Sequence, residues 1–264
     1  MKSHLFSKKA IEFGDKKNNQ LQMKLFYGEI NDDQVIIDNE EQTHIVKVLR
    51  MRSGEEIFVT DGKGNLAKGN LVFEGKKVSL DVQEIQENLP NFSTQLHIVI
   101  APTKNIDRIE FFVEKATEMG ITKITLLQTE KTERKNLNID KLRKQSIAAS
   151  KQSLRFHFPI INDLTKFSDF IKEVEPETTF VAHCNENLER IDLKMLRQAQ
   201  HDSLNEKGEN ITFLIGPEGD FSDKEIGLLA EKGVKAVSLG SQRLRTETAG
   251  VFVAAWNYAE NLIR

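Results

Sequence analysis

Two loops in the C-terminal part of the chain concentrate residues that could bind a ligand. The first, Gly216-Pro217-Glu218-Gly219, directly follows an apolar run at residues 211–215. Two glycines this close together expose backbone amides and let a ligand approach the main chain. The alternative is that they only permit a tight turn from strand to helix, because Ser222 and Glu225 have the spacing of a capping box.

The second loop, residues 239–249, brings two arginines, two threonines and a glutamate to the end of another apolar run. A fixed guanidinium could stabilise negative charge that develops on a reacting group. Arg245 and Glu247 could equally form an idle surface pair, and Thr246 and Thr248 could cap the apolar helix that follows. Ligands of open parallel sheets bind beyond the carboxyl ends of the strands, so two such loops together favour a binding site.

The elements that would position these loops follow an alternating pattern from residue 96 onward. The pattern predicts strands at 96–101, 124–127, 179–182, 211–215 and 236–239. It predicts helices at 107–119, 140–154, 167–174, 195–200, 225–232 and 248–263, and a polar insertion at 201–210. Alternation of apolar strands with helices is typical of an α/β domain whose mostly parallel sheet is covered on both faces.

The first 90 residues have a different pattern. Short extended runs at 35–37, 56–60, 67–73 and 77–82 are separated by turns such as Asp61-Gly62 and Glu74-Gly75, which favour antiparallel pairing. One short helix is expected at 40–50, with Ile45, Val46, Val48 and Leu49 on its apolar side. This pattern predicts a small β-barrel. A linker at 87–91 then divides the chain into domains at residues 1–90 and 91–264.

Charge is distributed unevenly along a chain whose net charge is only −3. Eight basic residues lie between 131 and 158 against two acids there, Glu133 and Asp140; the basic residues are Lys131, Arg134, Lys135, Lys141, Arg143, Lys144, Lys151 and Arg155. Such a surplus could neutralise phosphates, or it could be a solvated helix face.

Several classes of protein are disfavoured. No apolar run reaches the roughly 18 residues of a membrane span, and residues 1–9 lack the apolar stretch of a signal peptide, so the cytoplasm is expected. The single cysteine, Cys184, excludes an internal disulfide and is expected to be a buried apolar residue. The histidines lack metal-ligand spacing, and neither a P-loop nor a dinucleotide motif is present.

The two loops together resemble a known family. Leu214-Ile215-Gly216-Pro217-Glu218-Gly219, followed by Leu239-Gly240 and Arg243-Leu244-Arg245-Thr246-Glu247-Thr248-Ala249, is similar to the ribosomal RNA small subunit methyltransferase E family. His44 and Arg50-Met51-Arg52-Ser53-Gly54 resemble that family's RNA-binding PUA-like barrel, and the resemblance covers essentially the whole chain. Two residues depart from it: Asp220 replaces the last glycine of the commonest loop, Gly-Pro-Glu-Gly-Gly, and Lys151 stands where an acid is frequent.

The resemblance implies a SPOUT-type methyltransferase domain with a trefoil-knotted, mostly parallel sheet behind the PUA-like barrel. It implies a homodimer that uses S-adenosyl-L-methionine, without a metal, to methylate N3 of a uridine in the 16S rRNA of the small ribosomal subunit. The cofactor-binding residues it implies are His183, Leu214, Ile215, Gly216, Pro217, Glu218, Gly219, Leu239, Gly240, Leu244, Arg245, Thr246, Thr248 and Ala249.

A catalytic role is expected for Arg245, which would stabilise the uracil anion while Glu247 positions it; Arg243 is the alternative cation. No residue is an obvious general base. RNA contacts are expected from His44, Arg50, Arg52, Lys141, Lys144, Lys151 and Arg155. Two other functions stay open: a non-catalytic RNA-binding assembly factor, and a nucleotide-binding enzyme, although the first loop lacks a lysine.

Overall fold

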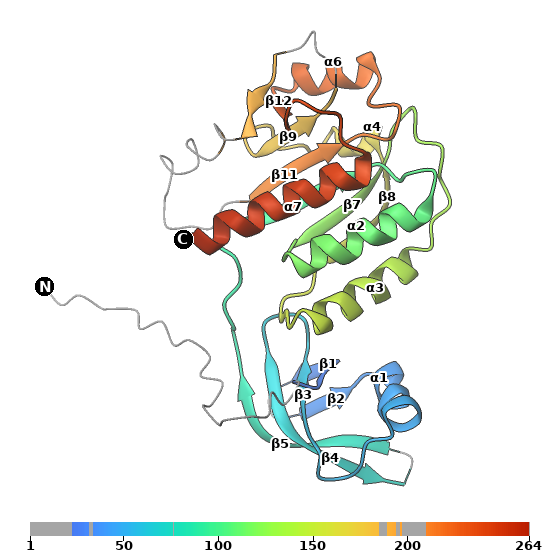
Figure 1. The fold of residues 1–264 in the computed structure, drawn as a ribbon, viewed down its shortest axis with the longest axis vertical. Coiled ribbons are helices and arrows are strands. Elements are labelled where there is room, and N and C mark those ends of the chain that lie inside the picture. Colours follow the sequence, from blue (N-terminus) through green and yellow to red (C-terminus); the bar gives the residue numbers. More distant parts are fainter. Residues whose placement is uncertain are drawn as a thin grey trace, which may run out of the picture.

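The computed structural model describes residues 23–31, 34–75, 77–184, 189–193, 196 and 210–263. It shows a small β-rich part below a larger α/β part (Figure 1). The expected helix at 195–200 and the polar insertion at 201–210 fall almost entirely outside the described residues.

The N-terminal part is a five-stranded sheet in the order β2-β1-β3-β4-β5. Its strands are β1 (Leu25–Asn31), β2 (Gln34–Ile37), β3 (Glu56–Thr60), β4 (Leu66–Glu74) and β5 (Lys77–Gln86). β1 and β3 run parallel, whereas the other neighbours are antiparallel. Because β2 also lies against β5, the sheet is nearly closed into a barrel around a core that includes Phe26, Ile57 and Leu71. The expected barrel is confirmed, with β1 as an additional strand.

The prediction of one short helix at 40–50 was wrong in its geometry. α1 (Asn39–Thr43) passes into a π-helical turn, η1 (His44–Leu49), which ends at Arg50 in the left-handed region with φ 51°. Ile45 is fully buried, but Val46, Val48 and Leu49 are exposed. A π-helical turn bonds i to i+5, so the side chains no longer follow the 3.6-residue period on which the expected apolar face depends.

The α/β part contains a seven-stranded sheet in the order β10-β12-β9-β11-β6-β7-β8. Every neighbouring pair is parallel, as the alternation predicted. The strands are β6 (Gln95–Ile100), β7 (Lys123–Gln128), β8 (Ile160–Lys166), β9 (Thr179–Ala182), β10 (Ile191–Asp192), β11 (Asn210–Ile215) and β12 (Lys235–Ser238). β8 and β10, at the two edges, were not expected.

Helices cover both faces of this sheet (Figure 1). α2 (Ile106–Glu118), α3 (Ile139–Gln152) and α7 (Thr246–Ile263) pack on one face, and α4 (Phe167–Phe170) and α6 (Asp223–Glu231) on the other. β6 shows why both faces are apolar: Ile98 and Ile100 join the core under α2 and α7, whereas Val99 joins the core under α4 and α6. The helix expected at 167–174 is only one turn long.

The two parts touch through the turn between β3 and β4. The Gly64 amide donates to the Phe156 carbonyl at 2.9 Å, and the Phe158 amide donates to the Gly62 carbonyl at 2.8 Å. Gly64 has φ +98°, and a Cβ there would lie 2.5 Å from the His157 ring. Glycine at this position therefore meets both a conformational and a steric requirement.

A close helix contact leads to a prediction about stability. A Cβ on Gly250 in α7 would lie 2.5 Å from the buried Phe112 ring of α2, whereas a Cβ on Gly227 in α6 would meet nothing within 4 Å. We expect Gly250→Ala to lower the free energy of unfolding by about 1–3 kcal/mol through overpacking. Gly227→Ala should raise it by about 0.5–1 kcal/mol through helix propensity. Urea unfolding of both variants checks this, and a stabilised Gly250→Ala would contradict the packing.

The half-buried His97 leads to a prediction about how the free energy of unfolding depends on pH. His97 in β6 lies with Nε2 2.8 Å from the Thr125 hydroxyl, and burial, with a smaller effect of the Lys123 charge, lowers its pKa from 6.5 to about 3. Between these pH values the unfolded chain binds one proton more than the folded chain. The contribution of His97 is thus complete above pH 6.5 and declines by up to about 1.4 kcal/mol per pH unit as the pH falls toward 3. Unfolding free energies measured from pH 7 to 4 should vary less in His97→Gln; equal slopes would refute this.

Candidate active site

The two glycine- and arginine-containing loops meet at the carboxyl edge of the parallel sheet. The loop 216–219 follows β11, and residues 239–245 connect β12 to α7. The buried Thr246 hydroxyl donates to the Gly216 carbonyl at 2.9 Å, which ties the loops together. Thr246 therefore uses its hydroxyl to join the loops, whereas the sequence had allowed it a role as a helix cap.

The loop 216–219 is held from outside by the segment after β7. The Lys131 ammonium donates to the Gly219 carbonyl at 2.8 Å and to the Phe221 carbonyl at 3.2 Å. The Glu130 amide donates to the Glu225 carboxylate at 2.8 Å, and both bonds of the expected Ser222–Glu225 capping box are present. Lys131 was counted only as part of the basic run, because nothing in its local sequence identifies a partner 88 residues away.

Asp220 also fixes this loop. It adopts a left-handed φ of 59°, which Asp tolerates better than most residues and glycine adopts freely. Its carboxylate accepts hydrogen bonds from the Phe221 amide and from the Cys184 amide, both at 2.8 Å. Asp220 thus connects the loop to the segment that follows β9, a contact that glycine could not make. Cys184 itself is exposed, so the expectation that it is buried was wrong: it lies beyond the end of β9, outside the sheet core.

His183 lies beside this contact. The residue is buried, and the Arg190 guanidinium donates to its carbonyl at 3.0 Å. Burial lowers the pKa of His183, Asp220 opposes that effect, and the Arg190 charge adds to it. A lowered pKa favours the neutral imidazole at neutral pH.

Arg108, in the first turn of α2, is a cation of the site that sequence reasoning missed. Its guanidinium lies 3.9 Å from the Glu218 carboxylate and 4.0 Å from the Glu247 carboxylate. Glu247 is buried, with one carboxylate oxygen that has no hydrogen-bond partner among the described residues. The expected pairing of Glu247 with Arg245 is therefore not what the structure shows: Arg108 is the ion-pair partner of Glu247, and Arg245 is exposed. An arginine in the first turn of an amphipathic helix resembles any solvent-facing residue, so no local signal identified it.

Most of the other residues that were expected to bind the cofactor have apolar side chains packed in or against a core. Leu214, Ile215 and Ala249 have side chains in the apolar cores, and Leu239 and Leu244 pack against the core under α7. Pro217 is buried, whereas Glu218, Gly219, Gly240 and Thr248 are exposed at the edge. A ligand at this edge would therefore meet mainly amides and carbonyls of the two loops.

The basic residues of α3 and its C-terminal end have partners within the chain. Lys141 pairs with Glu110, Lys144 with Glu40 and Lys151 with Glu41, so α3 is tied to both α2 and α1. The Arg155 guanidinium donates to the Glu118 carbonyl at 3.1 and 3.0 Å and lies over the rings of Phe92 and Tyr258. Three lysines of α3 are thus neutralised by acids on other elements.

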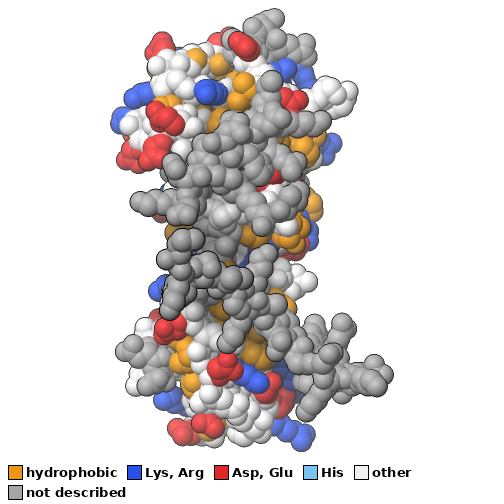
Figure 2. All heavy atoms as spheres, turned by 90° about the vertical axis from the view of Figure 1, so that its left-hand side faces the viewer, with side chains coloured by type: hydrophobic (Ala, Val, Ile, Leu, Met, Phe, Trp, Pro, Cys, Tyr) orange, Lys and Arg blue, Asp and Glu red, His pale blue; other side chains and the backbone are white. Residues whose placement is uncertain are grey.

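The barrel cations are more accessible. His44, Arg50 and Arg52 are exposed, and none has a side-chain ion pair among the residues that the structure describes. Figure 2 shows one face of the molecule. Among the described residues on this face, basic and acidic side chains are interspersed over both the β-rich and the α/β part. Contacts between RNA and all seven expected residues remain a prediction. The exposed side chains of the three barrel residues are the most accessible to RNA.

Two features are absent from the part of the chain that the structure describes. No group of three or more His, Cys, Asp or Glu side chains there could hold a metal ion. No helix there is long and apolar enough to cross a membrane.

Comparison with known proteins defines the class of this protein. Residues 90–257 match the model of the RNA methyltransferase domain, and residues 37–82 match that of the RNA methyltransferase PUA domain. The chain is thus an RNA methyltransferase with an N-terminal PUA domain.

Individual relatives identify the family. The chain is 31% identical over 220 residues to the ribosomal RNA small subunit methyltransferase E of Rickettsia conorii, covering 82% of this chain and 86% of that protein. It is 28% identical over 239 residues to the protein of the same name from Bacillus subtilis, covering 86% and 91%. It belongs to the ribosomal RNA small subunit methyltransferase E family, as the two loops had indicated.

Solved structures share the fold. A probable rRNA-methyltransferase from Porphyromonas gingivalis superposes with a TM-score of 0.78 at 29% identity, covering 91% of this chain and 99% of that one. A putative methyltransferase from Legionella pneumophila, solved with bound SAM, superposes with a TM-score of 0.77 at 24% identity, covering 90% and 98%. The expected combination of a parallel α/β sheet and a PUA-like barrel is confirmed.

Proposed function

We propose that this protein transfers the methyl group of S-adenosylmethionine to N3 of a uridine in 16S rRNA of the small ribosomal subunit. The observation that carries the proposal is the meeting of the two family motifs at one edge of the sheet, joined by the Thr246–Gly216 hydrogen bond. Membership of the family supports the substrate and the cofactor.

The residues at this edge fit the cofactor. A Cβ added at Gly240 would meet nothing within 4 Å, and one at Gly219 would meet only the Lys131 side chain, at 3.3 Å. Both loops therefore leave open space beside their backbone at these glycines, which a nucleoside with an amino-acid tail requires for close approach. When bound there, S-adenosylmethionine would supply an electrophilic methyl group on its sulfonium.

The chain must then stabilise the base as it loses its N3 proton. That proton is present at neutral pH, and when it passes to solvent water negative charge develops on O2 or O4 of the uracil. N3 would then take the methyl group as its bond to the sulfonium sulfur breaks, which releases S-adenosylhomocysteine. The Arg245 guanidinium is exposed and has no ion pair among the described residues. Its backbone is fixed, because the Arg245 carbonyl accepts from the Ala249 amide at 2.8 Å and the next residue is tied to Gly216. We assign Arg245 to the developing oxyanion.

For Glu247 we propose a role through Arg108 in place of the direct positioning of Arg245. It holds Arg108 near Glu218, which places a second cation where the two loops meet. Thr248 and Arg243 complete the exposed edge of the loop 239–249.

RNA reaches this edge from the barrel side in our proposal. His44, Arg50 and Arg52 contact phosphates and position the substrate without reading its sequence. Because N3 lies on the pairing edge of uridine, the target base must be unpaired or extruded. We place this reaction on ribosomal RNA in the cytoplasm.

We also propose that the protein acts as a homodimer. Phe111 of α2 and Phe252 of α7 are 48% and 42% exposed on helices that pack against each other. Trp256 does not add to this surface, since it packs on Phe213 of the core. Sedimentation of the wild type and of Phe252→Glu over a range of concentrations would test the interface.

The proposed reaction is tested in cells. When the gene is deleted, 16S rRNA should lose one methyluridine, and complementation should restore it. Mass spectrometry of the rRNA nucleosides measures this change. Unchanged rRNA would refute the proposal. Calorimetry with S-adenosylmethionine separates this function from a non-catalytic assembly factor, which would give no heat.

A further inference from the structure

A basic hollow lies next to the candidate active site. It has a volume of about 300 Å³ and is lined by Lys104, Glu133, Arg134, Lys135 and Asn136. Lys104 belongs to the segment between β6 and α2, and the other residues to the segment between β7 and α3. Three cations thus face one acid where two strand ends meet.

The hollow is organised by backbone contacts. The Arg134 guanidinium donates through Nε and Nη2 to the Lys104 carbonyl at 3.0 and 2.7 Å, which fixes its plane and leaves Nη1 outside this contact. The Lys104 amide donates to the Glu218 carboxylate at 3.1 Å. The cations are therefore connected through one residue to the loop 216–219, where the cofactor is proposed to bind.

The charges of the hollow are available to an outside ligand. Lys135 is exposed and has no ion pair among the described residues. Lys104 pairs with Glu133 at 3.0 Å, but the two side chains are 76% and 67% exposed. An ion pair this exposed contributes little and is readily exchanged for a contact with a stronger anion.

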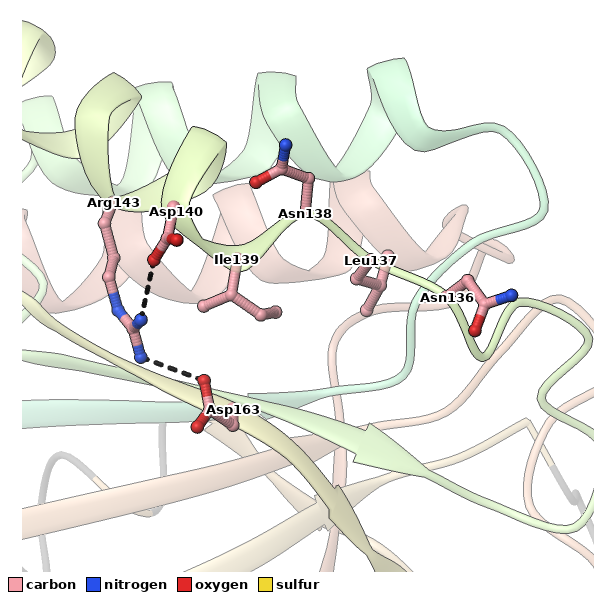
Figure 3. Close-up of a pocket in the computed structure, with 7 residues that line it drawn as sticks. All are labelled: Asn136, Leu137, Asn138, Ile139, Asp140, Arg143 and Asp163. Carbon is pink, nitrogen blue, oxygen red and sulfur yellow. Dashed lines mark hydrogen bonds and ion pairs between the residues drawn. The ribbon is translucent and has the colours of Figure 1, made fainter.

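A neighbouring hollow provides a contrast. It has a volume of about 630 Å³, shares Asn136 with the basic hollow, and extends to Arg143. Figure 3 shows the Arg143 guanidinium directed to both Asp140 and Asp163, at 3.1 and 2.9 Å. Two carboxylates outweigh one guanidinium there, so an anion would be repelled. The smaller hollow is the one suited to an anion.

We propose that Lys104, Arg134 and Lys135 bind a backbone phosphate of the RNA substrate close to the target nucleotide. This inference rests on the proposed function, since it places RNA beside the cofactor loops. Arginine and lysine bind phosphate without sequence preference, so the subsite would position the strand and leave base selection to other contacts. The basic run at residues 131–158 would then contact RNA mainly through the segment between β7 and α3, and less through α3 itself.

The test uses charge-neutral variants of similar size. Lys135→Gln, and Arg134→Gln with Lys135→Gln, are compared with the wild type for binding of a 16S rRNA fragment across a salt series. Lys232→Gln with Lys235→Gln is the matched control, because both residues are exposed at the amino end of β12, away from the loops. We expect the slope of log K against log salt to become shallower by about 0.7–0.9 for each phosphate that the variant no longer neutralises. Affinity for S-adenosylmethionine, measured by calorimetry, should stay unchanged.

Three results would overturn the subsite. They are an unchanged slope in the Arg134 and Lys135 double variant, an equal change in the control pair, and a parallel decrease in S-adenosylmethionine affinity, which would assign the hollow to the cofactor. Lys135→Gln removes no ion pair within the described chain, so its result does not depend on loop integrity. Methyl transfer is measured separately: a wild-type protein that binds RNA through this hollow but transfers no methyl would refute the proposed function and retain the subsite.

Discussion

Arg245→Ala should slow methyl transfer by a factor of about 10² to 10³ while leaving affinity for S-adenosylmethionine within a few-fold of the wild type. The guanidinium is exposed and lacks an ion pair among the described residues, so its removal leaves no buried group unsatisfied. Loss of one preorganised charge at a developing oxyanion typically costs a factor of about 10² to 10³ in rate. The measurement is single-turnover methylation of a 16S rRNA fragment, with cofactor binding followed by calorimetry.

Two companion variants make this result specific. Arg245→Lys retains the charge without the planar fork and should recover part of the rate. Arg243→Ala removes the other arginine of the loop, also exposed, and should retain more activity than Arg245→Ala. Wild-type rates in Arg245→Ala would refute the assignment, and inactivity of Arg243→Ala alone would transfer the role to Arg243.

Thr246→Val should weaken S-adenosylmethionine binding by about tenfold or more. The substitution keeps the shape of the side chain but removes the hydroxyl that donates to the Gly216 carbonyl inside a buried contact. A buried acceptor left without a donor costs about 1–3 kcal/mol, a factor of roughly 5 to 150, which here would separate the two cofactor loops. Calorimetry gives the dissociation constant.

Thr246→Ser is the matched control for this prediction. Serine retains the hydroxyl, so affinity should remain within a few-fold of the wild type. Equal affinities of the valine variant and the wild type would show that the tie does not shape the cofactor site. Equally weakened binding in both variants would show that retaining the hydroxyl is not sufficient, and the effect could not be assigned to the hydrogen bond.

Local periodicity determined most of the fold. The alternation of apolar runs with helical spacing predicted the parallel sheet, and β9 was predicted at its observed bounds. The Ser222–Glu225 capping box was readable because both partners lie within one helical turn. β8 was missed because it is an edge strand with mixed exposure, so neither apolar nor alternating periodicity identifies it.

The composition of the candidate site could also be read from the sequence, but its internal contacts could not. Both loops were located, since each directly follows a strand. The cation beside Glu247 was misassigned to the nearest arginine along the chain, and Arg108 was overlooked. Lys144 and Lys151 were expected to face RNA, although their carboxylate partners lie on α1, 104 and 110 residues away.

The sequence alone therefore determined which elements form and which residue types stand at their ends. Periodicity and capping act over a few residues, so both are visible in a single stretch of chain. Tertiary structure decided which charges remain available: it paired the lysines of α3 with acids, used Asp220 to connect two strand ends, and left Arg245, Lys135 and the barrel arginines exposed. The physical reason is that the partner of a charged side chain is set by which elements pack together, and a helical or strand period specifies only the face from which that side chain projects.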